Sequence, residues 1–84
     1  MPTSTDFREA LITALAGAEL QNLSFIDISA GNLHELVGDY PGPDHRMPSC
    51  CAVMRGEMGA NDVILTEPPK GTGASLTIRY HIPR

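Results

Sequence analysis

The chain has few of the bulky residues around which large cores are built. Tryptophan is absent, and aromatic residues make up 5% of the 84 residues, as two Phe and two Tyr. A core made by this chain must therefore consist mainly of Leu, Ile, Val, Ala and Met. Because 42% of the residues are hydrophobic, the composition predicts a single globular domain over residues 1–84 rather than a disordered chain.

Long apolar segments are also missing. No apolar run approaches the roughly 20 residues that a membrane-spanning helix needs, so we expect no membrane partner. The first residues, Met1 to Asp6, contain neither the basic region nor the apolar stretch of a signal peptide. The protein is therefore expected to be cytoplasmic.

Cysteine is rare, and its placement argues against disulfide, metal and thiol chemistry. Cys50 and Cys51 are neighbours, and a bond between neighbours is strained, so both are expected to be free thiols. On a helix they point about 100° apart, which does not suit one zinc ion. A base and nucleophile pair of His45 and Cys50 is not aligned by its spacing and has no third orienting group. We expect no cofactor, no metal and no enzymatic activity, with both cysteines serving as small core residues.

Positive charge is scarce and unevenly distributed. Six Lys and Arg residues face ten Asp and Glu residues, for a net charge of −4. Residues 1–44 contain one arginine and seven carboxylates, a net −6, whereas residues 45–84 carry a net +2. A domain can bind phosphates through a local basic face while its total charge is negative. The alternative is a solvated, polarised surface with no polyanionic partner.

Apolar residues at helical spacing predict three helices. In the first helix, Asp6 is expected to be the cap, with Glu9 three residues later as in a capping box. The second is expected to be capped by Ser29 and to stop at Gly38. The third follows a loop rich in Pro and Gly and should end at Gly59. Its apolar face is expected to contain Met47, Cys50, Cys51, Met54 and Met58.

Short β-rich runs predict three strands. Residues 25–28 and 63–66 are two of them, and residues 75–82 alternate apolar and polar side chains, which indicates one buried and one wet face. The segment between the last two strands, 67–73, is too long for a tight hairpin turn. The residues expected to be mostly buried are Phe25, Ile28, Leu33, Leu36, Met54, Leu65, Leu76 and Ile78.

Helix, strand, helix, helix, strand, wing, strand is the element order of winged helix-turn-helix domains, which nearly the whole chain resembles. This resemblance implies an α+β fold of three helices and a small antiparallel sheet with a C-terminal β-hairpin wing. Residues 45–56 would then be the recognition helix and residues 67–73 the wing. The box GDYPGPDHRMPSCC at 38–51, with the later PPKG at 68–71 and LTIRY at 76–80, resembles a small bacterial domain family of uncharacterised function.

Candidate contact residues lie mainly in these two segments. Helix N-terminal amides and positive side chains suit phosphates, and small side chains permit close approach to a groove. We therefore expect non-catalytic DNA binding through the third helix and the wing. The alternative, which stays open, is a protein-interaction or dimerisation module that uses the same surface. The candidate residues are His45, Arg46, Ser49, Arg55, Lys70 and Arg79.

Overall fold

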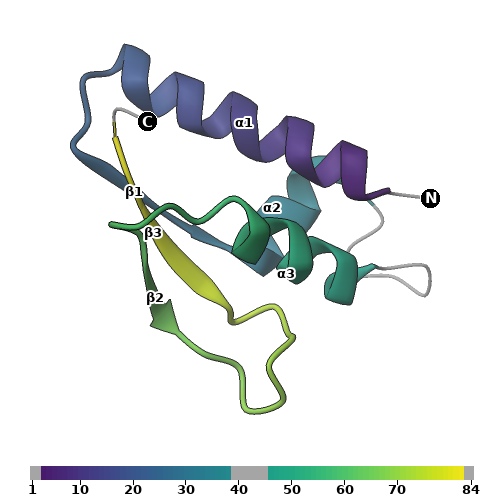
Figure 1. The fold of residues 1–84 in the computed structure, drawn as a ribbon. Coiled ribbons are helices and arrows are strands. Elements are labelled where there is room, and N and C mark those ends of the chain that lie inside the picture. Colours follow the sequence, from purple (N-terminus) through teal and green to yellow (C-terminus); the bar gives the residue numbers. More distant parts are fainter. Residues whose placement is uncertain (1–2, 39–45, 83–84) are drawn as a thin grey trace.

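The computed structural model describes residues 3–38 and 46–82. Along this part of the chain the elements are α1 (Ser4–Leu20), β1 (Phe25–Ser29), α2 (Ala30–Val37), α3 (Met47–Gly56), β2 (Val63–Thr66) and β3 (Thr77–His81). The fold is therefore α+β, with three helices and a three-stranded antiparallel sheet among the described residues. Figure 1 shows the helices gathered on one side of the sheet.

α1 begins with a capping box. The Thr3 hydroxyl accepts a hydrogen bond from the Asp6 N–H at 3.2 Å, and the Asp6 carboxylate accepts one from the Thr3 N–H at 2.9 Å. Two N–H groups at the start of the helix are satisfied in this way. The prediction that Asp6 is the cap and Glu9 its partner is wrong, because Thr3 is the cap and Asp6 is the third helical residue. Ser29 caps α2 as predicted, accepting a hydrogen bond from the Asn32 N–H.

β3 is the central strand of the sheet. It pairs antiparallel with β1 on one side and with β2 on the other, which gives the order β1-β3-β2. Ile28, Ile78 and Ile64 lie opposite one another across the three strands. Because alternate residues of a strand face opposite sides, this row sets which side of every strand meets the helices.

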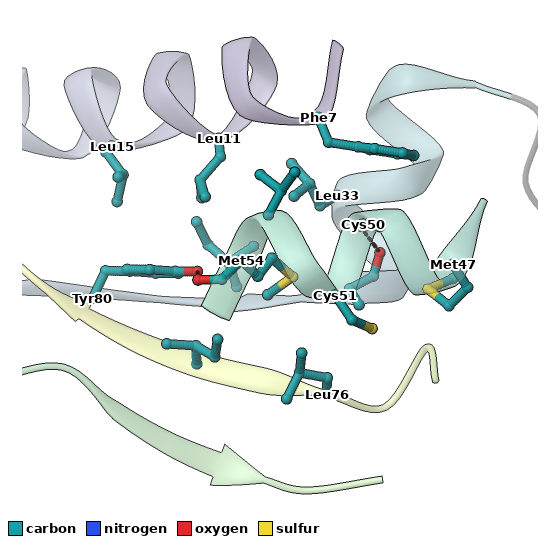
Figure 2. Close-up of a cluster of buried hydrophobic side chains, with 14 residues drawn as sticks. Phe7, Leu11, Leu15, Leu33, Met47, Cys50, Cys51, Met54, Leu76 and Tyr80 are labelled. Atoms are coloured by element: carbon teal, nitrogen blue, oxygen red, sulfur yellow. Dashed lines mark hydrogen bonds between the residues drawn. The ribbon is translucent and has the colours of Figure 1, made fainter. Parts of the chain in front are cut away.

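The core lies between the helices and the inner side of the sheet. Figure 2 shows α3 between α1 and β3, with side chains from all three elements meeting. The predicted burial of Ile28, Leu33, Met54, Leu76 and Ile78 is confirmed. The whole apolar core consists of Phe7, Leu11, Leu15, Ala18, Ile28, Ala30, Leu33, Met47, Cys50, Cys51, Val53, Met54, Leu76, Ile78 and Tyr80.

Three residues expected in the core are instead exposed. Phe25 is 42% exposed, Leu36 is 73% exposed and Leu65 is 45% exposed. Strand side chains alternate, so Phe25, three residues before the buried Ile28, must lie on the outer side of the sheet. Leu65 follows the inward-facing Ile64 and faces outward for the same reason. Leu36 lies on the outer side of α2.

α3 is shorter than expected. It begins at Met47 with Pro48 in its first turn, where the missing N–H costs no intrahelical bond. It ends at Gly56 rather than at Gly59. Val53, which is not part of the predicted apolar face, is also buried, because α3 packs against both α1 and α2. The buried face also contains, as predicted, Met47, Cys50, Cys51 and Met54, and Met58 packs against the core just beyond the helix.

Candidate binding surface

Small side chains cover the exposed side of α3. Pro48, Ala52 and Gly56 are exposed, and Ser49 is half-buried. A Cβ added at Gly56 would meet nothing within 4 Å, so the helix backbone is open there. A partner can therefore approach the backbone of α3 more closely than it could approach a helix covered by long side chains.

Arg46 is the N-cap residue of α3 and is exposed. Its backbone N–H donates to Nε2 of His34 at 2.7 Å, and its own side chain makes no capping bond. The Arg46 side chain therefore lies at the positive end of the helix dipole, where an anion would be stabilised. His45, the other residue expected at this end, lies outside the described residues.

Arg55 joins α3 to the loop between β2 and β3. Its guanidinium donates to the Glu67 carboxylate at 2.5 Å and to the Gly71 carbonyl oxygen at 2.7 Å. The side chain is half-buried, and its charge is balanced by Glu67. Arg55 therefore fixes the loop against the helix.

The loop between β2 and β3 is held at several other points. The Gly71 N–H donates to the Pro68 carbonyl oxygen at 3.0 Å, closing a turn in which Gly71 has a φ of 83°. The Cys51 thiol donates to the Gly73 carbonyl oxygen and accepts from the Gly73 N–H. Lys70 is exposed within the turn. Lys70 therefore belongs to a loop that is hydrogen-bonded to α3 through both Arg55 and Cys51.

Arg79 lies elsewhere. It stands between the buried Ile78 and Tyr80 on β3, so its side chain faces the outer side of the sheet. There it makes two hydrogen bonds to the Asp27 carboxylate, at 2.8 and 3.1 Å, and covers the Phe25 ring at 4.1 Å. The hydrogen bond from Arg79 holds the pKa of Asp27 below its ordinary value. Arg79 is therefore not part of the surface formed by α3 and the loop.

Arg8 is closer to α3 than its place in the acidic half of the chain indicates. Its guanidinium donates to the Glu57 carboxylate at 3.2 Å, joining α1 to the residue that follows α3. Both side chains are partly exposed, so the pair contributes little to stability. The pair places Arg8 beside the C-terminal end of α3.

Both cysteines are buried, free thiols, as expected. The Cys50 thiol donates to the Ala30 carbonyl oxygen at 3.5 Å. Burial raises the pKa of Cys50 from 9.0 to about 12, and the neighbouring Cys51 adds to the rise. Among residues 3–38 and 46–82, no three His, Cys, Asp or Glu side chains are grouped so that they could hold a metal ion.

Three buried side chains, His34, Asp62 and Tyr80, make polar contacts around α3 that were not predicted. His34 is fully buried, the Asp62 carboxylate accepts from the N–H groups of Gly59 and His81, and the Tyr80 hydroxyl donates to the Met54 carbonyl oxygen. Sequence signals exist for the burial of two of them: His34 follows Ala30 by one helical turn and so lies on the same face of α2, and Tyr80 alternates with Leu76 and Ile78 along its strand.

Comparison with known proteins identifies no relative of this chain. No protein-family model, no curated protein and no solved structure matches the chain. Within the part of the chain that the structure describes, no helix is both long and apolar enough to cross a bilayer.

Proposed function

We propose that the chain is a winged-helix domain that binds DNA without catalysis, with α3 as the recognition helix and residues 67–73 as the wing. The observation that carries the proposal is the attachment of the loop between β2 and β3 to α3, through Arg55 and Cys51, in a domain with sheet order β1-β3-β2. Helix and loop then present one continuous surface.

The exposed side of α3 supports this proposal. Its small side chains let the helix sit close to a groove floor, and Arg46 stands at the helix end that favours phosphate. Lys70 supplies a second positive charge on the wing. Base discrimination would fall to Ser49, whose hydroxyl can both donate and accept.

The small number of cations sets the expected strength. If Arg46 and Lys70 each neutralise one phosphate, log K falls with log salt with a slope of about −1.8. Raising the salt from about 50 to 200 mM then weakens binding by about 12-fold. Such weak electrostatics require that shape and groove contacts supply the remaining affinity.

The test is a titration of a fluorescently labelled duplex at two salt concentrations. Arg46→Ala is expected to weaken binding and to reduce the magnitude of the salt slope by about 0.9, because one phosphate contact is lost. Lys70→Ala should reduce the salt slope by a similar amount but weaken binding less than Arg46→Ala, since an ammonium lacks the planar, paired donors of a guanidinium.

Arg79→Ala is the matched control, because it removes the same charge from the outer side of the sheet. It is expected to bind duplex as the wild type does. The proposal fails if the wild type binds no duplex at low salt, or if Arg79→Ala weakens binding as much as Arg46→Ala.

A protein-interaction or dimerisation module on the same surface is the second candidate. The observation that favours it is the pairing of Arg55 with Glu67 and of Arg79 with Asp27, in a chain of net charge −4. These pairs reduce the positive charge available to a polyanion. Self-association in sedimentation experiments that is insensitive to salt, without duplex binding, would favour this second function.

A further inference from the structure

His34 is the one fully buried ionisable side chain on α2. Its ring meets the Phe7 ring edge-on, with ring centres 4.8 Å apart and planes at 68°. A polar ring in such a place must find hydrogen-bond partners, because an unsatisfied buried polar group costs about 1–3 kcal/mol.

Both ring nitrogens of His34 have backbone partners, one on each side of the segment 39–45. Nδ1 lies 3.0 Å from the Gly38 carbonyl oxygen, and Nε2 lies 2.7 Å from the Arg46 backbone nitrogen. The Arg46 N–H can only donate, so Nε2 must offer its lone pair. The proton is therefore assigned to Nδ1, which donates to Gly38, and one tautomer satisfies both contacts.

These contacts join the end of α2 to the start of α3. Gly38 is the C-cap residue of α2 and Arg46 is the N-cap residue of α3. The bond from the Arg46 N–H to His34, together with the bond from the Cys50 N–H to the Arg46 carbonyl oxygen, holds the backbone at this point. The side chain that starts from this backbone is the one placed at the phosphate-binding end of α3.

We propose that His34 is a positioning residue, which holds the Arg46 backbone so that the Arg46 side chain can contact a DNA phosphate. This inference rests on the proposed DNA-binding function. In this proposal His34 is buried and touches no DNA itself. It acts through Arg46, whose side chain makes the contact with the phosphate. Besides packing against Phe7, His34 makes two hydrogen bonds that act at the C-cap of α2 and at the N-cap of α3.

The first test requires no DNA and follows amide hydrogen exchange in the free protein. His34→Phe keeps an aromatic ring against Phe7 but removes both nitrogens. The Arg46 amide is expected to exchange at least about tenfold faster in this variant, whereas the amide of Met54, in the same helix, changes less. Equal acceleration at both amides would show general loosening and would overturn the inference. If His34→Phe does not fold, His34→Gln, which can still accept from Arg46, is measured instead and should keep the Arg46 amide protected.

The second test is a double-mutant cycle in duplex binding, at a temperature where all variants are folded. His34→Phe should reduce the magnitude of the salt slope by about 0.9, as Arg46→Ala does. The double variant should bind within about twofold of Arg46→Ala alone, because both changes remove the same contact. Independent, additive losses would overturn the inference while leaving the DNA-binding function intact. Absence of duplex binding by the wild type would overturn both proposals.

Discussion

The hydrogen bond between Tyr80 and α3 offers a direct measure of how the end of this helix is held. The last four carbonyl groups of a helix have no intrahelical partners, and that of Met54 is one of them because α3 ends at Gly56. The Tyr80 hydroxyl donates to this oxygen at 2.8 Å in a fully buried setting, and Figure 2 shows the ring reaching from β3 toward α3. Tyr80→Phe keeps the ring and leaves a buried acceptor, so we expect a loss of about 1–3 kcal/mol.

The loss is large enough to measure by thermal or urea unfolding. With an unfolding entropy of about 2.1 cal/mol/K per residue, a chain of 84 residues loses about 6 °C in Tm per kcal/mol. Tyr80→Phe should therefore lower Tm by about 6–17 °C. Thr77→Val is the matched control, because it removes a hydroxyl from the same strand whose bond, to the Ser75 carbonyl oxygen, is exposed. It should change stability by no more than about 0.5 kcal/mol. Equal stability of Tyr80→Phe and wild type would refute the reasoning.

Two further predictions concern the core. Leu76→Ala should destabilise the fold by about 2–5 kcal/mol in urea unfolding, through a cavity under the sheet, whereas Leu36→Ala, on the outer side of α2, should have little effect. A large loss at Leu36 would contradict the burial described above. Because burial raises the pKa of Cys50 to about 12, the thiol should react slowly with a thiol reagent at neutral pH. Its contribution to stability should be complete below pH 9.0 and decline as the pH rises toward about 12, since only the unfolded chain loses the proton there. Fast labelling of the native protein at neutral pH would refute this.

The elements whose apolar residues repeat with a single period could be predicted from the sequence. The buried residues of α1, which include Phe7, Leu11 and Leu15, recur once per turn. Leu76, Ile78 and Tyr80 alternate as a half-buried strand requires. In both cases, the period by itself identifies the element and its buried face, because one neighbouring layer covers that face.

The exposed Leu36 and the buried His34 have a common explanation. The prediction placed Leu33 and Leu36 in the core because these residues are apolar. At 100° per residue, Leu36 lies about 110° from the middle of the face that Ala30, Leu33, His34 and Val37 share. Hydrophobicity favoured Leu36, but the two backbone partners available to His34 allowed a polar ring to occupy the face instead.

The exposed Phe25 was predictable in principle. It lies three residues before Ile28, and a strand cannot bury both on one side. The sequence could not show the cation–π contact of its ring, which lies under the Arg79 guanidinium of the neighbouring strand. Residues far apart in the chain make this contact, as they do in the pairing of Arg55 with Glu67, and local patterns carry no information about such partners.

The binding surface depends on contacts that come from outside α3. A helix of ten residues is not stable alone in water, so its position must be set by the rest of the fold. His34 holds its N-cap residue, Cys51 and Arg55 bind the loop to its middle and end, and Tyr80 holds a carbonyl of its last turn. A surface fixed at both ends loses little conformational entropy when it binds, and this offsets part of the cost of association. With few positive charges available, such preorganisation is the physical means by which this acidic domain could hold a duplex, and loosening either end of α3 should weaken binding even where no contact residue changes.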